Sequence, residues 1–397
     1  MNRKQFLLLL VLVVILGGAG LLVHQRGNQS WEQSSSVLGA KLLPNLAVND
    51  IAQITVQGGT NELHLVRTDN RWRVRERANY PANFSQLSAW LLKLADLKIA
   101  QTQDVGPSQL ARFALLPPGP ATNTATRVEF ADANGKVMAS LLLGKKHLKQ
   151  PSAHQPAGLG DDAWPDGRYV MVGGKTTTLD VITDSMDNAE PRPDQWLDKD
   201  FLNVEKPGVI AVDFPEATNS WRLTRASETN DWQLDGAGPK EKLDADKISG
   251  VTSPLGSANF TDVLAPDTQP EASGLTNVTR LTVTTLDGFT YAAQIGQKQA
   301  DNYPVTFTLT ANLPPESAVT NTPPAPGAKP DDQAKAAADA KAARKTLTDK
   351  LAREQQYQHW IYLMPSYTID PLLKPRGDLL VVETNTPPAP PATPEAK

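Results

Sequence analysis

The sequence predicts an α+β fold: two tandem similar units of antiparallel strands, each with a covering helix, plus an N-terminal transmembrane helix. Three observations lead to this prediction. A set of apolar positions recurs along the chain, short segments alternate polar and apolar residues, and an uncharged apolar stretch lies near the amino terminus. A recurring pattern indicates a duplicated unit, and a period of two is typical of half-buried strands.

The internal repeat is the strongest of these observations. At a constant offset of 156, four apolar residues return in the pairs Leu46 and Leu202, Val48 and Val204, Ile54 and Ile210, and Val56 and Val212. Trp72 returns as Trp232 at an offset of 160, and residues 127–130 match 280–283 at 153. Loop insertions and deletions explain the small changes in offset. A repeat is a packing unit first, which favours a scaffold or a binding surface.

The amino terminus predicts a membrane anchor over residues 1–24. Arg3 and Lys4 precede the uncharged apolar run from Phe6 to Val23. Its eighteen residues would span about 27 Å as a helix, close to the roughly 30 Å of bilayer hydrocarbon. We expect residues 6–23 to cross the bacterial inner membrane once, with the bulk of the chain in the periplasm. A cleaved signal peptide and a buried soluble helix are the alternatives.

A polar tether is expected at 25–45, followed by the first repeat unit at 46–200. Alternation predicts strands at 51–56, 62–67 and 71–75. Leucines at helical spacing, behind a cap at Asn83 or Ser85, predict a helix over 83–97 that lies on the sheet. Two hairpins should follow, with strands at 126–131, 136–143, 169–172 and 177–182.

The second repeat unit is expected at 201–383 with the same order of elements. The predicted strands lie at 208–214, 220–226, 230–235, 279–285, 289–295, 303–310 and 359–364. The helix at 244–255 should be shorter or kinked, because it contains Gly250 and Pro254. The tail at 384–397 is rich in proline and should be disordered.

The second unit carries an insertion at 311–358 that has no counterpart in the first. It opens with a proline run and continues as an Ala/Lys-rich segment, which predicts a helix over 331–356. Leu347, Leu351 and Tyr357 are its large apolar side chains. Such a helix is either an arm that binds a partner or a solvated, partly disordered excursion.

Composition and motifs offer little for catalysis. The chain has 39 basic and 43 acidic side chains, a net charge of -4, which argues against a general nucleic-acid binder. It has no cysteine, and its five histidines lack zinc-site spacing. His147, His154, Asp161 and Asp162 fall in one loop, where a solvated loop is favoured over a loose metal cluster. We therefore expect no catalytic residue, no metal site, no cofactor and no enzymatic activity, although a site assembled from distant loops leaves no local pattern.

One segment has an unusual charge pattern. Arg71, Arg73, Arg75 and Arg77 alternate with other residues, so a strand would place all four on one face while Trp72 and Val74 face the core. Guanidinium groups in a row suit an anionic ligand or an acidic partner. The alternative is a solvated edge strand whose charges prevent aggregation.

Several motifs occur together in the first half of the chain: Leu43-Pro44, Ile51 to Val56, Arg71 to Val74, the helix through Leu97, and Phe113 to Pro118. In this combination they resemble a bacterial family, domain-of-unknown-function family 4340. The resemblance implies an amino-terminal anchor and a repeated α+β region outside the cytoplasm. The family assigns no catalytic residue, and its members are often found beside gliding-type ABC transporter components.

Together these observations predict a non-enzymatic, membrane-anchored periplasmic accessory or scaffold protein of an envelope complex, associated with an ABC transport system. The expected partners are the inner membrane and a protein of the envelope, without nucleic acid or a small-molecule cofactor. An extracytoplasmic binding module for an anionic glycan or lipid is the alternative. An envelope hydrolase is a third and less favoured reading.

Overall fold

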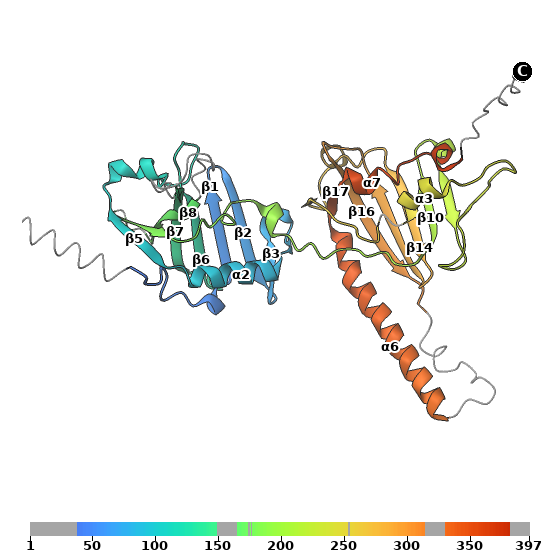
Figure 1. Cartoon of the computed structure of the whole chain (residues 1–397), viewed down its shortest axis with the longest axis horizontal. Helices are drawn as coiled ribbons and strands as arrows, with labels where there is room; N and C mark the ends of the chain where they lie inside the picture. The colour runs from blue at the N-terminus through green and yellow to red at the C-terminus, as the bar shows by residue number, and fades with distance from the viewer. Residues whose placement is uncertain are drawn as a thin grey trace, which may run out of the picture. The chain divides into compact units, whose positions relative to one another are not determined.

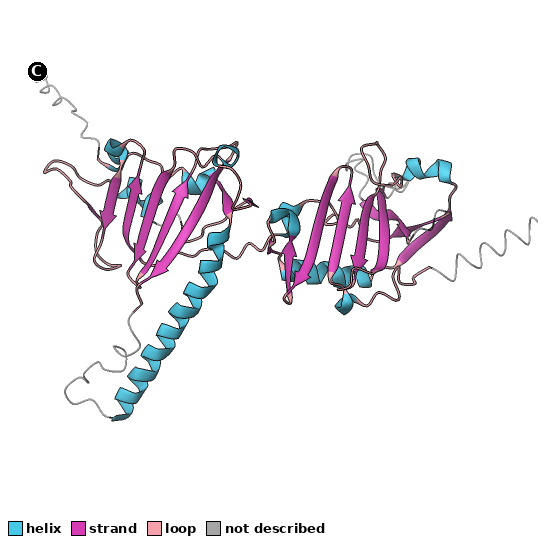
Figure 2. Cartoon of the chain, turned by 180° about the vertical axis from the view of Figure 1, so that it is seen from behind, coloured by secondary structure: helices cyan, strands magenta, loops and turns pink. Residues whose placement is uncertain are grey.

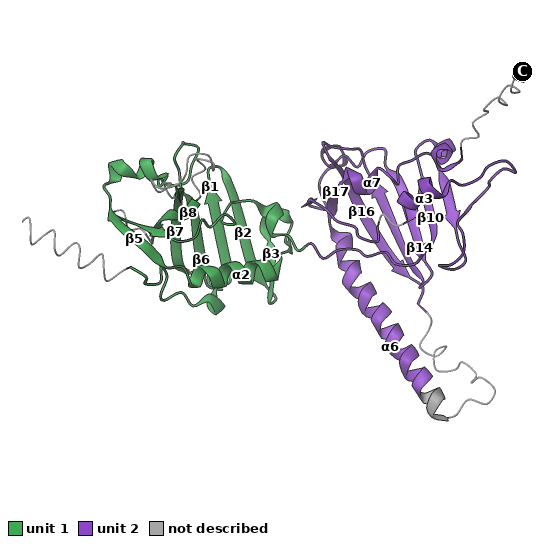
Figure 3. Cartoon of the chain, in the orientation of Figure 1, with its two compact units in different colours: residues 1–198 green, residues 199–397 purple. Residues whose placement is uncertain are grey.

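The computed structural model describes residues 38–148, 165–173, 175, 177–252, 255–313 and 330–381. The chain divides into two compact units, residues 1–198 and 199–397 (Figure 3). The predicted anchor at 6–23, most of the predicted tether and the Pro-rich tail at 384–397 lie outside the described residues. Across the residues that are described, no helix combines the length and apolar character needed to cross a membrane.

Unit 1 contains a nine-stranded antiparallel sheet in the order β4-β3-β2-β1-β6-β7-β8-β9-β5 (Figures 1 and 2). Within β1, Ile54 and Val56 are fully buried while Thr55 between them is half-exposed. One face of the sheet therefore forms the core. The strands lie at Gln53–Gly58 (β1), Asn61–Thr68 (β2), Arg71–Val74 (β3), Tyr80–Pro81 (β4), Ile99–Asp104 (β5), Thr126–Ala131 (β6), Val137–Leu148 (β7), Pro165–Val172 (β8) and Thr178–Ile182 (β9).

Helix α2 (Phe84–Ala95) covers the buried face of this sheet, in front of the strands in Figure 1 and behind them in Figure 2. The helix begins at Asn83, whose side chain accepts a hydrogen bond from the backbone N–H of Gln86 at 3.0 Å. Trp90 is its largest buried side chain, and the ring lies 5.9 Å from Phe130 and 5.4 Å from Trp196. The predicted helix over 83–97 is thus present and lies on the sheet.

Unit 2 contains an eight-stranded antiparallel sheet in the order β12-β11-β10-β14-β15-β16-β17-β13. Its helices are α3 (Ala245–Thr252), α4 (Pro270–Ser273), α6 (Pro330–Gln355) and α7 (Ser366–Ile369). Helix α3 occupies the place of α2 and is shorter, as predicted. The strands lie at Pro207–Asp213 (β10), Trp221–Thr224 (β11), Gln233–Leu234 (β12), Asp262–Leu264 (β13), Thr279–Thr285 (β14), Phe289–Ile295 (β15), Asn302–Ala311 (β16) and Ile361–Pro365 (β17).

The residue pairing confirms the tandem repeat. In unit 1, Ile54 pairs with Phe130 and Val56 pairs with Val128. In unit 2, Ile210 pairs with Val283 and Val212 pairs with Leu281. These residues correspond at the offsets of 156 and 153 that the sequence repeat shows. Apart from the two-residue strand β4, the sheets also have the same strand order, so the repeat is structural as well as sequential.

The edge strands β5 and β13 were not predicted. In β5, Ile99 is the only buried residue, because a strand at the margin of a sheet meets solvent on most sides and needs little apolar alternation. Part of the predicted tether also packs against unit 1. Leu42 and Leu43 are 5% and 7% exposed, and the backbone N–H of Leu42 donates to the carbonyl oxygen of Leu97 at 2.8 Å.

The matched core positions predict matched stability losses. Ile54→Ala and Ile210→Ala each remove buried methyl groups and leave a cavity, so each should lower the free energy of unfolding of its own unit by about 2–5 kcal/mol. Hydrogen exchange of the amides in β1 and β10 measures the two losses. The half-exposed control Gln53→Ala should cost less than about 1 kcal/mol. A near-zero cost at either isoleucine would contradict the equivalence.

Candidate functional site

The arginine-rich segment does not form the single face that the sequence predicted. Strand β3 ends at Val74, and residues Arg75–Arg77 form a 3-10 turn. The chain turns there because it must reverse direction to pair Tyr80 with Val74 in β4. Arg71 and Arg73 share a strand face, whereas Arg75 and Arg77 leave it. The prediction of one row of four guanidinium groups is therefore wrong in its geometry.

Several of these arginines already have partners within unit 1. The Arg73 guanidinium donates to the carbonyl oxygen of Asn79 at 3.1 Å. That of Arg75 lies 2.7 Å from Nδ1 of His64, which itself lies 2.6 Å from Oε1 of Glu76. Trp72 and Val74 face the core as predicted, at 7% and 0% exposure. Anion binding by this segment stays a prediction, carried now by the exposed Arg71 and by Arg73.

The histidine loop provides no metal centre in the part of the chain that is described. His147 lies in β7, and its Nδ1 is 2.6 Å from Oδ1 of Asp166. His154, Asp161 and Asp162 lie outside the described residues. Among those that are described, no group of three or more His, Asp or Glu side chains could hold a metal ion.

Among the described residues, helix α6 has no counterpart in unit 1, where only residues 173–177 separate β8 from β9. It has 26 residues and lies between β16 and β17, where the sequence predicted a helical insertion. At 1.5 Å per residue it is about 39 Å long. Its C-terminal end lies beside the sheet and the rest extends away from it (Figures 1 and 2). Leu347 and Leu351 are half-buried, and most of the side chains between Lys335 and Arg353 are exposed.

The last turns of α6 are anchored by a buried polar cluster. Glu354 is 1% exposed, and its Oε2 accepts a hydrogen bond from the hydroxyl of Tyr291 in β15 at 2.8 Å. Nζ of Lys350 donates to the carbonyl oxygen of Asn203 at 2.8 Å and lies 3.2 Å from Oε2 of Glu205. These contacts join α6 to the sheet and to the segment that precedes β10.

An aromatic group continues the anchor beyond the helix. The 3-10 turn Gln356–His359 follows α6 and buries Tyr357. The centroid of the Tyr357 ring lies 5.3 Å from that of Phe201. The Phe201 centroid lies 5.0 Å from that of Phe260 and 4.4 Å from that of Tyr362. Edge-to-face contacts, such as those of Phe201 with Tyr357 and Phe260, add to the stabilisation from buried area. The base of α6 is therefore rigidly placed, while its outer turns meet solvent.

A scan of protein families matches the chain at residues 72–155 and 157–278 to the model described as a domain of unknown function, DUF4340. The match covers just over half of the chain, in two adjacent segments. The chain belongs to the DUF4340 family. Searches of curated proteins and of solved structures gave no match to this DUF4340 protein.

Burial sets the protonation behaviour of the α6 anchor in this DUF4340 protein. It raises the pKa of the Glu354 carboxyl, while the Tyr291 hydroxyl, the cations of Lys350 and Arg353 and the backbone N–H of Asn203 act in the opposite direction. Burial, together with the Glu354 carboxylate, also raises the pKa of Tyr291. Among the described residues Oε1 of Glu354 has no hydrogen-bond donor, although Lys350 and Arg353 each approach within 3.8 Å. The ionised carboxylate is thus held at a cost in desolvation.

Sequence reasoning found the helix and missed its anchor. Glu354 lies in a charged segment of ordinary composition, and Tyr291 is 63 positions away in an alternating strand. One signal was available: Tyr291 stands at an inward position of β15, where a hydroxyl needs a buried partner.

The raised pKa of Glu354 predicts a definite pH dependence. Between the unfolded carboxyl value of about 4.3 and the higher folded value, the folded state binds more protons, so the free energy of unfolding falls as pH rises. Glu354→Gln removes this contribution and keeps an oxygen that can accept from Tyr291. Urea unfolding of both proteins from pH 4.5 to 8 measures the difference.

Glu241 provides the control of opposite sign. Hydrogen bonds from the backbone of Gly238 and from Arg376 lower its pKa, so its contribution to stability is present above the unfolded value and is lost as pH falls. Glu241→Gln should remove that loss. Parallel pH profiles for the wild type and Glu354→Gln would contradict the role given to Glu354.

Proposed function

We propose that this chain is a non-enzymatic, membrane-anchored accessory or scaffold protein of a bacterial envelope complex, and that α6 is the arm with which it binds a protein partner. The observation that carries the proposal is a long, largely exposed helix that is held firmly at its C-terminal end. A helix with mostly alanine as its apolar content gains little by docking on its own protein. Such a helix is suited to binding a second protein.

A cluster of basic side chains in the middle of the arm, at Lys341, Arg344 and Lys345, favours an acidic partner. Over residues 330–355 the helix carries five acidic and six basic residues, so its excess of positive charge is small and lies in this cluster, while the whole chain has a net charge of -4. The basic residues are Lys335, Lys341, Arg344, Lys345, Lys350 and Arg353. Complementary charge raises the association rate and fixes the orientation of a complex.

The proposed setting rests on the amino-terminal sequence. The apolar run from Phe6 to Val23 follows Arg3 and Lys4, an arrangement that keeps the amino terminus in the cytoplasm and exports the rest. An anchored scaffold that presents a basic arm in the periplasm fits an accessory subunit of an envelope complex. An ABC transport system is the complex that we propose.

The arm predicts loss of partner binding on charge reversal. The triple variant Lys341→Glu, Arg344→Glu and Lys345→Glu keeps the anchor of α6 intact and should weaken partner binding about tenfold or more, roughly 1.4 kcal/mol. A photo-crosslinking residue at position 341 of the full-length chain, in native membranes, identifies the partner. Affinity of the purified pair is then measured at two salt concentrations, since charge-driven binding weakens with salt.

A charge-matched control separates this effect from net charge alone. Lys98→Glu, Lys136→Glu and Lys240→Glu change exposed side chains away from α6 and should leave binding unchanged. Equal binding by the arm variant and the wild type would exclude α6 as the contact. The variant Arg71→Glu with Arg73→Glu tests the anionic glycan or lipid alternative in the same membranes.

The anchor predicts retention in the membrane. The full-length chain should stay in the pellet after alkaline extraction, with its bulk accessible to protease from the periplasmic side. Leu12→Arg with Ile15→Arg should release it, because each central charge costs about 2.5–3.5 kcal/mol on insertion. Leu12→Ala with Ile15→Ala is the control. A mature chain that lacks residues 1–24 would instead indicate a cleaved signal peptide.

A further inference from the structure

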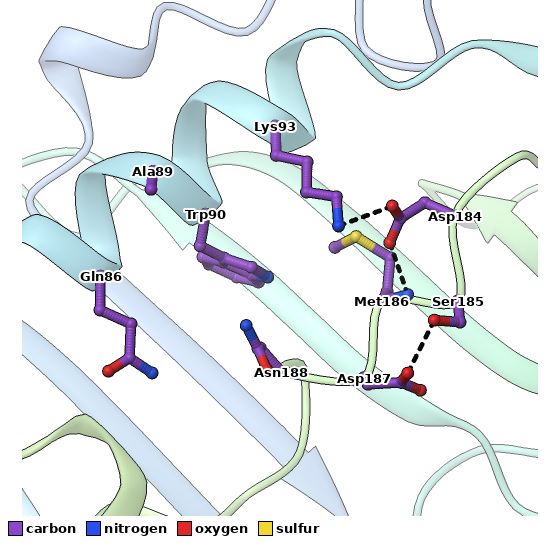
Figure 4. A pocket seen from close by; sticks show the side chains of 9 residues that line it. All are labelled: Gln86, Ala89, Trp90, Lys93, Asp184, Ser185, Met186, Asp187 and Asn188. Carbon is purple, nitrogen blue, oxygen red and sulfur yellow. Dashed lines mark hydrogen bonds and ion pairs between the residues drawn. The ribbon is translucent and has the colours of Figure 1, made fainter.

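Unit 1 contains a cleft of about 350 Å³ between α2 and the loop that follows β9. Such a volume lies within the range of small-molecule sites. Figure 4 shows the helix on one side and the loop on the other. The lining residues are Gln86, Ala89, Trp90 and Lys93 from α2 and Asp184, Ser185, Met186, Asp187 and Asn188 from the loop.

The loop is held in one conformation from behind. The Arg168 guanidinium in β8 donates to the carbonyl oxygens of Ser185 and Met186 at 3.2 Å and to that of Gly144 at 2.8 Å. The Asp184 carboxylate accepts from the backbone N–H of Met186 at 2.8 Å. Met186 itself has a φ of +51°, a backbone conformation that side chains other than glycine rarely adopt. Surrounding contacts therefore impose the shape of the loop.

The charges around the cleft are paired. Nζ of Lys93 lies 2.7 Å from Oδ2 of Asp184, and Nζ of Lys146 lies 2.5 Å from Oδ1 of Asp187. Hydrogen bonds from Lys146 and Ser185 lower the pKa of Asp187, so that carboxylate is ionised at neutral pH. With its cations matched by carboxylates, the cleft does not favour an anionic ligand.

Three polar groups of the cleft have no partner in the described part of the chain. Trp90 is 4% exposed, and its Nε1 is buried without an acceptor. In Figure 4 the nitrogen side of the ring points toward the loop. The side-chain amides of Gln86 and Asn188 also make no hydrogen bond with described residues, and Asn188 points from the loop toward Trp90 (Figure 4). A buried donor without an acceptor is destabilising unless a ligand supplies one.

The second repeat unit differs from the first at the helix position that holds Trp90. The helix caps Asn83 and Asp244 correspond at an offset of 161, which places Val251 of α3 where α2 has Trp90. A smaller pocket of about 10 Å³ lies beside α3 in unit 2 and is lined mostly by apolar residues, including Val251 and the fully buried Leu372 after β17. Unit 1 thus has the larger of these two spaces, and charged and amide side chains are part of its lining.

We propose that this cleft binds a small neutral saccharide. Side-chain amides such as Gln86 and Asn188 donate and accept at once, which suits adjacent sugar hydroxyls. The indole N–H of Trp90 supplies a donor for a ring or hydroxyl oxygen. The exposed Ala89, with the largely buried Trp90 and Met186 beside it in the wall of the cleft, gives the C–H groups of the sugar a small apolar contact. Met186 is unbranched and adaptable, so it can shift to admit an oxygen to the indole nitrogen. This site goes beyond the proposed function, since the arm belongs to unit 2.

The test follows the indole N–H of Trp90 directly. The full-length chain, labelled with ¹⁵N-tryptophan in nanodiscs, is titrated with N-acetylglucosamine and with its β-1,4-linked dimer, and Trp90→Phe assigns the resonance. The Trp90 indole signal should move with a saturable profile while the other tryptophan indoles serve as internal references. Gln86→Ala with Asn188→Ala should weaken the fitted affinity about tenfold or more.

The controls separate binding from misfolding and from other ligands. Asn188 is exposed, so Asn188→Ala alone tests the site if the double variant unfolds. Gln101→Ala removes an exposed amide elsewhere in unit 1 and should bind as the wild type does. A Trp90 signal that stays fixed with both sugars overturns the proposal. A signal that moves with inorganic phosphate or with dialanine instead assigns the cleft to an anion or a peptide and also overturns it.

Discussion

The pairing of two central strands through one buried face is the constraint on which each unit depends. Val56 meets Val128 in unit 1, and Val212 meets Leu281 in unit 2. A slip of one residue in either pair would turn the whole apolar set toward solvent, so register is fixed by burial. The covering helix packs against that buried face. In α2, the buried leucines are spaced so that they meet the apolar side of the sheet. Loops and insertions are free to vary because they lie outside this pairing.

Prediction from sequence succeeded where burial of one sheet face produces a regular alternation of apolar and polar residues. Alternation located the central strands within a few residues, and the offsets of the repeat identified the equivalent positions of the two copies. Prediction failed at an edge strand and at a turn that follows a strand. Strand β5 has Ile99 as its buried residue, and the arginine segment looked like a long strand because charge alternation does not report the turn after Val74. Long-range polar partners, such as Tyr291 and Glu354, leave no local pattern at all.

The candidate sites also differ in how far the sequence could predict them. The arm was visible in the sequence because helix-forming residues cluster in it, whereas the cleft was not, because α2 and the loop near Met186 are far apart in the chain and each looks ordinary alone. The two copies share the central strands, whose packing fixes each sheet. They differ at the cleft beside α2 and at the β16–β17 connection, which contains α6. Divergence at such positions is typical of acquired function, since changes there cost little stability.

The insertion also covers part of an incompletely paired strand, β16, in its own sheet. Strand β17 pairs with β16 from Asn302 to Val305, so the rest of β16 has no other described strand on that side. Gln358 fills part of the gap, since its side-chain oxygen accepts from the backbone N–H of Leu309 at 3.3 Å. Bare hydrogen-bonding groups along a strand invite addition of a strand from another molecule. The base of the insertion thus hinders the addition of a strand from another molecule to β16 and so opposes self-association in fibres. We expect substitutions in the outer turns of α6 to be tolerated far more readily than loss of this base.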